Sequence, residues 1–482
     1  MDDLEFDNHA CAATGKPRAT TGKPRAARPK AKAQAGGERR KAGIRAVKKI
    51  LKKKTSGKQQ KAKPTTTRQA SSSSLQNMVA TKFLQELGAL ASKLAAEERE
   101  GGSSFARAEL RRGRTILLGS DCAGLGSDLV SLVMSLDTAS AKTKFVAEAD
   151  QGKLQWLRAI SAHLADETPE LEYQDITTRD NRLAPRVHLF VSGAPCPPFS
   201  SAGKRGGLSD DRGWLILHSL SYVVWQRPMV AVFENVKGLA NARNKALLDA
   251  IVKILKDCGY KVYADILNTQ EHGLPQSRPR VYVVAMLKDY ILPTRKFSFP
   301  EPIAMPSLER CLDHQKELPD SNMPDQASGK SAIRNIRKAR GRLLAKGSDD
   351  VPSSEEVVVD TGCGKNFFSM MIGRSPCLTK ARGGQGGYYL LKRKRHMTIY
   401  EMGAIQGWDK SWVDILLEAN SSCKKLGKAF GDGMSLNVLQ RLLPRALYTV
   451  NLVNKLPEDH WKNMPKSGRL PRAVYKQKLR RR

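Results

Sequence analysis

A single cysteine stands among three prolines in the stretch "VSGAPCPPFS", residues 191–200. The thiol of Cys196 is a nucleophile, a metal ligand or a packed core group, and an isolated cysteine after a strand is usually buried and inert. Here, however, prolines fix the backbone on both sides of the thiol. A loop as constrained as this one favours a chemical role for Cys196.

One carboxylate and two arginines near other apolar runs would complete such a site. Glu234, in "FENVKGL", is expected just beyond the end of a fifth strand. Arg278 and Arg280, in "QSRPRVY", come before a further strand. A thiol beside an acid and cations suits covalent catalysis on an electron-poor ring. Taken alone, Glu234 also suits a helix cap or an ion pair, and the arginines also suit phosphate or surface contacts.

Two glycines and two more carboxylates have the spacing of a nucleotide site. Gly124 and Gly126 follow the run "TILLG" and allow a tight turn, with close backbone approach to a ligand, before a helix begins. Glu148 ends the second apolar run, 24 residues after Gly124, and suits the hydroxyls of a ribose. Asp175 follows the third run similarly. A Gly-x-Gly pair by itself is more often only a turn.

The elements that must position these residues are short strands alternating with helical patterns. Besides the third run, which precedes Asp175, the expected strands are "TILLG" from 115, "KFVAE" from 144, "VHLFVSG" from 187, "MVAVF" from 229, "YKVYADIL" from 260 and "RVYVVAML" from 280. This alternation predicts an α/β fold with a mostly parallel, doubly wound sheet over residues 112–290. Ligands of such sheets bind beyond the carboxyl ends of the strands, where the candidate residues lie.

The rhythm of strands and helices breaks after about residue 290. Residues 291–394 carry Pro, Gly, Ser and charges in irregular order, so we expect a second, smaller domain or a large insertion there. A helical pattern returns in "TIYEMGAIQGW", where Thr398 and Glu401 form a capping box. Residues 395–455 are therefore expected to rejoin the first domain, and 456–482 to form a basic tail.

The amino-terminal part is strongly basic. Residues 11–70 contain 20 Lys or Arg and one acid, Glu38. The excess of basic residues in this segment is more than half of the net charge of +35. Residues 1–74 are therefore expected to be disordered. Such a segment binds nucleic-acid phosphates without reading sequence, or serves as a nuclear import signal; a merely solvated tail is the alternative. An amphipathic helix is expected from Leu75 to about Glu98, before a linker.

Other features exclude several classes of protein. The acidic start "MDDLEFDNHA" argues against a secretory signal and a transit peptide. No uncharged apolar run approaches the roughly 20 residues of a membrane span. The eight cysteines include no Cys-x-x-Cys pair, so neither a disulfide framework nor a zinc finger is indicated. A reducing intracellular compartment fits best.

Six stretches resemble, in the right order, the motifs of the cytosine-C5 DNA methyltransferases, over about residues 114–289 and 370–450. They are "GAPCPPFS", "GKRGGLSDDRGWL", "FENVKGL", "QSRPRVYVVA", "RHMTIYEMGAIQGW" and "FGDGMSLNVLQ". The resemblance implies a Rossmann-like class I methyltransferase that uses S-adenosylmethionine. It further implies double-stranded DNA as partner, a target-recognition region at 291–394 and a monomer acting on DNA.

The same resemblance implies a role for each site residue. Cys196 would attack C6 of a flipped cytosine while Glu234 bonds N3 and the exocyclic amine. Arg280 would hold O2, and Arg278 would support the loop and backbone. The cofactor-binding residues implied are Gly124, Leu125, Gly126, Glu148, Asp175, Ile176, Pro195 and Leu215. No metal is implied.

Two departures from the family pattern concern the cofactor. The residues before Ala123 are Ser120, Asp121 and Cys122, without the aromatic residue that the family places in its first motif. Asp432 stands where an asparagine is usual, which puts a charge beside the cofactor. Both changes are expected to weaken cofactor binding without removing the chemistry, and Cys122 is expected to line the pocket at most.

Two other functions stay open at this point. An RNA (tRNA) cytosine-C5 methyltransferase carries the same catalytic motifs, and a catalytically silent chromatin or nucleic-acid-binding protein would retain the fold as a scaffold. The Pro-Pro pair after Cys196 and the sizeable region 291–394 favour DNA, and the intact catalytic residues favour an enzyme. Glycines beside Lys380 and Arg382 suit a loop entering a DNA groove. The basic tail favours the nucleus in a eukaryotic host, and otherwise the cytoplasm.

Overall fold

The computed structural model describes residues 66–101, 115–136, 140–165, 169–195, 199, 207–313, 329–345, 355–364, 367–383 and 387–464. Cys196 lies outside these described residues. Of residues 1–74, which are predicted to be disordered, 1–65 also lie outside the described part, whereas 66–74 belong to a helix and contradict the prediction. Of the predicted basic tail at 456–482, residues 465–482 lie outside the described part.

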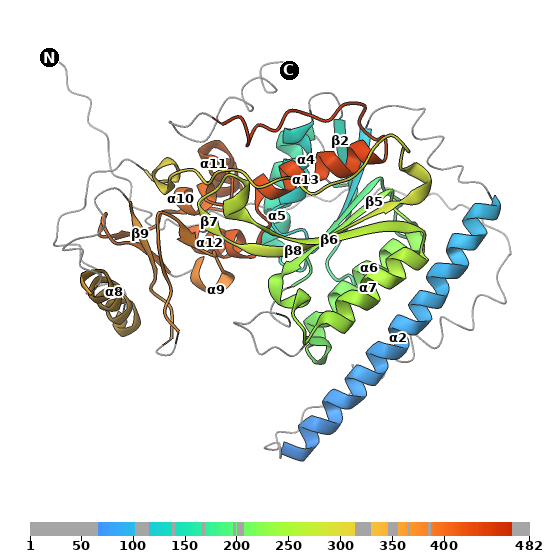
Figure 1. Ribbon diagram of the computed structural model, residues 1–482, viewed down its shortest axis with the longest axis horizontal. Coiled ribbons are helices and arrows are strands. Elements are labelled where there is room, and N and C mark those ends of the chain that lie inside the picture. Colours follow the sequence, from blue (N-terminus) through green and yellow to red (C-terminus); the bar gives the residue numbers. More distant parts are fainter. Residues whose placement is uncertain are drawn as a thin grey trace, which may run out of the picture. The chain divides into compact units, whose positions relative to one another are not determined.

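A seven-stranded sheet with the order β3-β2-β1-β4-β5-β8-β6 forms the centre of the described part (Figure 1). Its strands are β1 (Thr115–Asp121), β2 (Ser140–Ala147), β3 (Leu171–Tyr173), β4 (Leu189–Ser192), β5 (Val230–Val236), β6 (Tyr260–Asn268) and β8 (Pro279–Leu287). The first five in spatial order pair in parallel, whereas β8 runs antiparallel to both β5 and β6. The expected mostly parallel, doubly wound sheet is thereby confirmed.

Both faces of this sheet are covered by helices. In β5, Val230 and Val232 belong to one buried layer, whereas Ala231 and Phe233 belong to the other. The first layer contains α4 (Ser127–Ser135), α5 (Gln151–Ala165) and α13 (Leu436–Thr449), and the second contains α6 (Leu215–Gln226) and α7 (Lys245–Asp257). Strands buried on both faces require continuous apolar runs, so these strands can be predicted from the sequence.

A long helix, α2 (Thr66–Gly101), lies along α6 and α7 (Figure 1). Leu87 and Ala91 are buried in that layer, and the ring of Phe83 packs edge-on against Trp214. The expected helix is therefore present, but it begins at Thr66 rather than at Leu75. Serine is only a moderately poor helix former, so the run Ser71–Ser74 does not end the helix.

A smaller, four-stranded antiparallel sheet follows, with the order β10-β9-β12-β13. Its strands are β9 (Val357–Asp360), β10 (Met370–Ile372), β12 (Tyr388–Leu390) and β13 (Arg395–His396). Helix α8 (Gly329–Leu344) buries Ile336, Ala339 and Leu343 against it. A short parallel pair, β7 (Gln276–Ser277) with β11 (Ser375–Pro376), connects this part to the segment before β8.

Short helices complete the described chain. They are α9 (Lys380–Gly383), α10 (Ile399–Ala404), α11 (Lys410–Ala419), α12 (Cys423–Asp432), η1 (Gly207–Ser209), η2 (Asp211–Trp214), η3 (Lys237–Ala240), η4 (Thr269–His272), η5 (Lys288–Tyr290) and η6 (Leu308–Cys311). Thr398 and Glu401 form the predicted capping box at the start of α10. Within the described part of the chain, no helix combines the length and the apolar composition that crossing a bilayer requires.

Candidate active site

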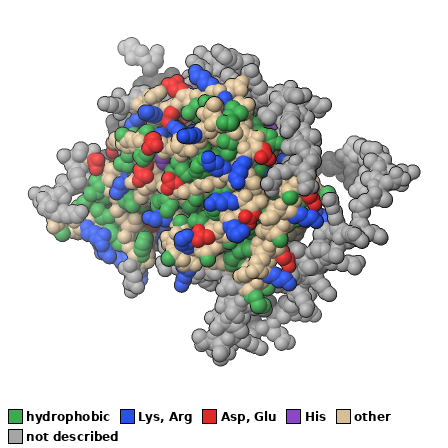
Figure 2. Space-filling model, turned by 45° about the vertical axis from the view of Figure 1, so that its right-hand side comes forward, with side chains coloured by type: hydrophobic (Ala, Val, Ile, Leu, Met, Phe, Trp, Pro, Cys, Tyr) green, Lys and Arg blue, Asp and Glu red, His purple; other side chains and the backbone are tan. Residues whose placement is uncertain are grey.

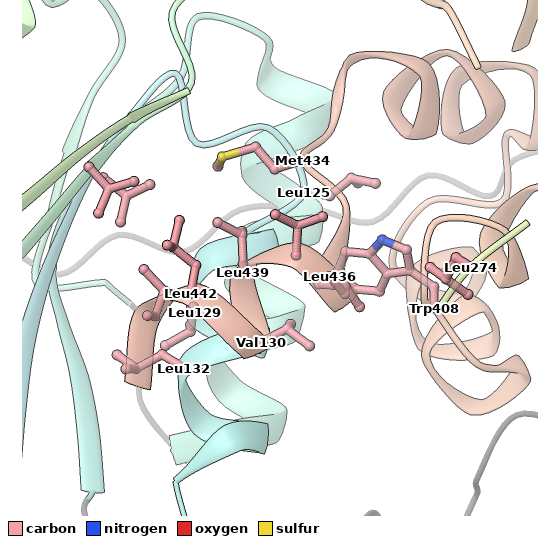
Figure 3. Packing of buried hydrophobic residues seen from close by; sticks show 14 of the residues in the cluster. Leu125, Leu129, Val130, Leu132, Leu274, Trp408, Met434, Leu436, Leu439 and Leu442 are labelled. Atoms are coloured by element: carbon pink, nitrogen blue, oxygen red, sulfur yellow. The ribbon is translucent and has the colours of Figure 1, made fainter. Parts of the chain in front are cut away.

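The glycine turn follows β1 as predicted. Gly124 and Gly126 have φ of 61° and 69°, and Gly126 is the N-cap of α4. A Cβ built on Gly124 would meet only the carbonyl oxygen of Cys122, at 4.0 Å, so the backbone there is open to approach. Leu125 between them is fully buried and packs with Met434 and Leu436 in the core that α4 and α13 share (Figure 3).

Glu148 stands directly after β2, beside this turn. Its Oε2 accepts a hydrogen bond from the Gly124 amide over 3.0 Å, and its Oε1 accepts one from the Asp150 amide over 3.0 Å. Each carboxylate oxygen retains a second lone pair, which can accept a hydroxyl. An open glycine turn beside a fixed carboxylate fits an adenosyl cofactor: the carboxylate suits its ribose, and the turn suits the group attached to the ribose.

The other predicted cofactor residues come from three further segments. Asp175 and Ile176 lie in the loop after β3, where Ile176 is buried and Asp175 Oδ1 accepts the Thr177 amide over 2.8 Å. Pro195 is half-buried and directly precedes the undescribed residues 196–198. Leu215 is the first residue of α6 and is also half-buried.

Asp432, at the end of α12, is surrounded by lysines. Its Oδ2 lies 3.2 Å from Lys153 Nζ and 2.9 Å from Lys380 Nζ. Lys153 Nζ also lies 3.9 Å from Glu148 Oε2. Burial lowers the pKa of Lys153, but Glu148 and Asp432 outweigh it, so the net shift is upward and the ammonium form is favoured. The charge that distinguishes this chain at position 432 is therefore compensated.

The centre of the site is the ion pair of Glu234 and Arg280. Glu234 Oε1 lies 3.2 Å from Arg280 Nε, and their side chains are only 4% and 11% exposed. Burial raises the pKa of Glu234, and the two arginines, Arg280 and Arg278, offset part of this rise. A carboxyl group with a raised pKa is available in its protonated form, as a proton donor to a base requires.

Two predicted positions differ in detail. Glu234 lies inside β5 and not beyond its end, and Arg280 lies inside β8 and not before it. The reason is that β5 continues to pair with the antiparallel strand β8 as far as Val236, which is opposite Arg280. A run of extended residues cannot reveal where its partner strand stops.

Both described ends of the Cys196 loop are held against the segment that carries Glu234. The Asn235 side chain donates to the Ala194 carbonyl oxygen over 3.1 Å. At the other end, a Cβ on Gly238 would lie 2.0 Å from the carbonyl oxygen of Phe199, so only glycine allows this approach. Asn235 and Gly238 are site residues that the sequence analysis did not assign, although both stand in "FENVKGL".

Arg278 is fully buried and joins two segments that are far apart in the sequence. Its guanidinium donates to the carbonyl oxygens of Leu378 and Gly433, over 2.8 and 2.6 Å, and more weakly to that of Gly431. It thus joins the end of α12 to the segment after β11. The supporting role expected of Arg278 stays a prediction, for which these bonds to backbone oxygens provide the geometry.

Cys377 is a residue of the site that the sequence analysis missed. Its Sγ accepts N–H groups from Arg278 over 3.5 Å and from Arg280 over 3.6 Å. Burial raises the pKa of the thiol, but Arg280 and Arg278 outweigh it, so the net shift is downward. No local pattern reveals this contact, because only the pairing of β7 with β11 brings residue 377 to the arginines.

Cys258 also accepts an N–H group, from Arg227 over 3.4 Å, whereas Cys122 lies beside carboxylates. Cys122, at φ 55°, follows β1, and burial together with Asp121 and Glu148 raises the pKa of its thiol well above the ordinary value. A neutral Cys122 can line the turn but is a poor nucleophile. Among the described residues, no group of three or more His, Cys, Asp or Glu is arranged to hold a metal ion.

The two cations beside the glycines of the loop expected to enter a DNA groove are each paired with a carboxylate of the protein. Lys380 contacts Asp432, as described above, and Arg382 Nε donates to Asp360 Oδ1 over 2.8 Å. Lys380 is 62% exposed at its side chain, whereas Arg382 is 28% exposed. Of the two, Lys380 is therefore the more accessible to a phosphate.

Comparison with known proteins gives a consistent result. The family model described as C-5 cytosine-specific DNA methylase matches residues 127–446. The type II methyltransferase M.HhaI of Haemophilus parahaemolyticus is 26% identical over 274 residues, which are 55% of this chain and 77% of that protein. The type II methyltransferase M.NgoBI of Neisseria gonorrhoeae is 28% identical over 272 residues, with coverages of 56% and 77%.

A solved structure of a methyltransferase from Entamoeba histolytica also aligns with this chain. The TM-score is 0.49 at 15% sequence identity, and the alignment covers 69% of this chain and 98% of that one.

Proposed function

The chain belongs to the C-5 cytosine-specific DNA methylase family. We propose that Cys196 is the nucleophile of this chain. The protein is a DNA (cytosine-5-)-methyltransferase, which transfers a methyl group to C5 of cytosine in DNA. S-adenosylmethionine supplies the methyl group when bound. The proposal concerns which residues of this chain perform the reaction.

In the proposed mechanism, a cytosine flipped out of the duplex enters the site beside β5 and β8. The Cys196 thiolate adds to C6, while the protonated carboxyl of Glu234 donates to N3 and its other oxygen accepts from the exocyclic amine. Negative charge then develops at C5, which becomes nucleophilic. Once C5 carries the methyl group, water takes the C5 proton, and the C5–H electron pair re-forms the C5=C6 double bond as the thiolate leaves C6. N3 then returns its proton to Glu234.

The observation that carries this proposal is the buried Glu234–Arg280 pair, with the ends of the Cys196 loop fixed beside it. Ala194 is bonded to Asn235, the residue after Glu234, and Phe199 is in contact with Gly238, so both ends of the loop lie against the segment from Glu234 to Gly238. In this scheme Arg280 moves from Glu234 to O2 of the base, and Arg278 holds the surrounding backbone.

On the cofactor side, the residues proposed to bind S-adenosylmethionine surround the ends of β1, β2 and β3. Gly124 and Gly126 give the open turn, with the Leu125 side chain supporting it from the core. Glu148 would bind the ribose hydroxyls, and Asp175 with Ile176 would bind the adenine. Pro195 and Leu215 would close the pocket near the Cys196 loop.

The decisive test is trapping with a duplex that contains 5-fluorocytosine. Fluorine at C5 blocks the final loss of the proton, so the protein should form a denaturation-resistant adduct in the presence of S-adenosylmethionine. Mass spectrometry should place the adduct on Cys196, and Cys196→Ser should form none. An adduct on another residue would refute the nucleophile assignment, whereas an adduct only on RNA would move the substrate to RNA.

We further propose that residues 11–70 bind DNA phosphates and that 291–394 select the target site. On the described face in Figure 2, Lys and Arg side chains are interspersed with acidic and apolar ones rather than gathered into one patch. Residues 11–70 contain 20 Lys or Arg and one acid, more than half of the net charge of +35, so this segment is proposed to supply most of the non-specific affinity. Deleting residues 1–65, which stops before α2, should weaken DNA binding and its salt dependence. An altered target sequence in this deletion variant would contradict the assignment.

The same basic segment is proposed to direct the protein to the nucleus in a eukaryotic host. Fusion of residues 11–65 to a fluorescent reporter should concentrate the reporter in nuclei, and an even distribution would refute this role. The protein is also proposed to act as a monomer on DNA. Light scattering on the complex should give the mass of one chain plus one duplex, and the mass of two chains plus one duplex would exclude a monomer.

A further inference from the structure

A buried ion pair joins the end of β1 to the loop after β3. Arg179 donates from Nη1 to Asp121 Oδ1 over 2.6 Å and from Nη2 to Oδ2 over 2.8 Å. The two side chains are 1% and 0% exposed. The proposed catalytic mechanism gives no role to either residue or to their pairing. Burying two charges is costly unless the other polar atoms of both side chains are also bonded.

Those other atoms are bonded. Ser219 Oγ donates to Asp121 Oδ2 over 2.9 Å, and Arg179 Nε donates to Asn181 Oδ1 over 2.8 Å. The guanidinium carbon is also enclosed by aromatic rings, at centroid distances of 5.1 Å from Phe145, 5.2 Å from Tyr173 and 5.0 Å from Tyr222. A planar, bidentate guanidinium held in this way has one orientation.

This fixed pair lies between the segments proposed to hold the cofactor. Asp121 is the last residue of β1, directly before the turn of Gly124, and its carbonyl oxygen accepts the Gly193 amide over 3.1 Å. Arg179 follows Asp175 and Ile176 in the same loop. The pair therefore connects the glycine turn, the loop after β3 and the start of the Cys196 loop.

We propose that Asp121 and Arg179 are positioning residues for the cofactor pocket. Their pairing sets the loop of Asp175 and Ile176 at a fixed place relative to the turn of Gly124, and this inference rests on the cofactor role proposed for those residues. The first motif of this chain has Cys122 in place of an aromatic residue. The buried pair, placed next to Cys122, supplies the rigidity that the small side chain of Cys122 does not.

The test measures binding of S-adenosylmethionine by calorimetry, without DNA, in Arg179→Lys and Asp121→Asn. Each variant should raise the dissociation constant about tenfold, as loss of one charge-assisted hydrogen bond would. Duplex affinity, and kcat at saturating S-adenosylmethionine, should stay within about twofold of wild type. The matched control is Arg182→Lys, in the same loop, whose pair with Asp180 is 34% exposed at both side chains and which should leave cofactor binding unchanged.

A double variant, Asp121→Leu with Arg179→Met, separates positioning from simple stability. It removes both charges and leaves neither unpaired, so the melting temperature should return towards wild type. Affinity for S-adenosylmethionine should nevertheless remain low, because the loop loses its fixed position. Recovery of both properties would overturn the proposal, as would wild-type cofactor affinity in Arg179→Lys.

Glu148→Ala distinguishes failure of this inference from failure of the cofactor assignment. If Arg179→Lys binds as wild type and Glu148→Ala does not, the positioning role falls and the cofactor site stands. If Glu148→Ala binds as wild type while Arg179→Lys does not, the assignment of Glu148 falls and the positioning role stands. Equal losses of cofactor binding, DNA binding and melting temperature in Arg179→Lys would show that the pair only stabilises the fold.

Discussion

Glu234 and Arg280 belong to neighbouring antiparallel strands, and their side chains meet with 3.2 Å between Oε1 and Nε. In the strand register Glu234 is opposite Tyr282 and Val236 is opposite Arg280, so the two residues are diagonal neighbours. Residues two apart on a strand share a face of the sheet, as Tyr282 and Val284 do in the layer of α4 and α13. The acid and the cation are therefore placed together by strand pairing alone.

The raised pKa of Glu234 predicts the alkaline limb of the pH profile. Burial favours the protonated carboxyl, so the single-turnover methylation rate should fall as pH rises through this pKa. Glu234→Gln should lower the rate about 100-fold or more and remove the alkaline limb, as measured from about pH 5 to about pH 9. An unchanged alkaline limb in this variant would exclude Glu234 as the titrating acid.

Cys377 is predicted to tune that limb through Arg280. Arg280 and Arg278 lower the pKa of the Cys377 thiol against the effect of burial; once ionised, its Sγ would compete with Glu234 for the Arg280 guanidinium and raise the pKa of Glu234. Cys377→Ser should therefore move the alkaline limb to lower pH, with the maximal rate reduced less than about tenfold. Cys363→Ser is the control, because burial raises the pKa of that thiol to about 11 and its coulombic partners are Asp360 and Arg382. Movement of the limb to higher pH would contradict this coupling.

Asp432 and Lys153 are predicted to differ in their effect on the cofactor. Asp432→Asn should change the affinity for S-adenosylmethionine by less than about threefold, since the pairs of this partly exposed carboxylate contribute little. Lys153→Met should weaken binding about tenfold, because Glu148 then loses the Lys153 ammonium, whereas Lys380 still pairs with Asp432. Lys410→Met, which removes an exposed pair with Asp414, is the control. Calorimetry measures all three, and a stronger effect of Asp432→Asn would reverse the interpretation.

Two glycine substitutions should have opposite effects on stability. A Cβ on Gly427 would lie 2.1 Å from the carbonyl oxygen of Gly383, so Gly427→Ala forces α12 and α9 apart. We expect a loss of about 2–3 kcal/mol in the free energy of unfolding. Gly341 lies inside α8 with nothing within 4 Å of its Cβ position, so Gly341→Ala should gain about 0.5–1 kcal/mol. Urea unfolding measures both, and equal midpoints would show that α9 yields to the added methyl group.

Local patterns predicted a large part of this fold. The apolar runs became strands because a sheet buried on both faces needs continuous apolar residues, and Gly124 and Gly126 became a turn because both require positive φ. The capping box of Thr398 and Glu401 was also legible, since all of its partners lie within four residues. The start of helix α2 was predicted too late, at Leu75 instead of Thr66, because serine weakens a helix signal without ending the helix.

Contacts between distant segments were decided only by the tertiary structure. The sequence by itself determined the family motifs, the doubly wound sheet and the residue types at the strand ends, because these depend on short-range spacing. The lysines around Asp432, the thiol of Cys377 beside Arg278 and Arg280, and the pair of Asp121 with Arg179 join residues far apart in the chain. Whether a charge is compensated or a thiol is ionised depends on those partners, and no spacing along the chain specifies which segments the folded sheet brings together.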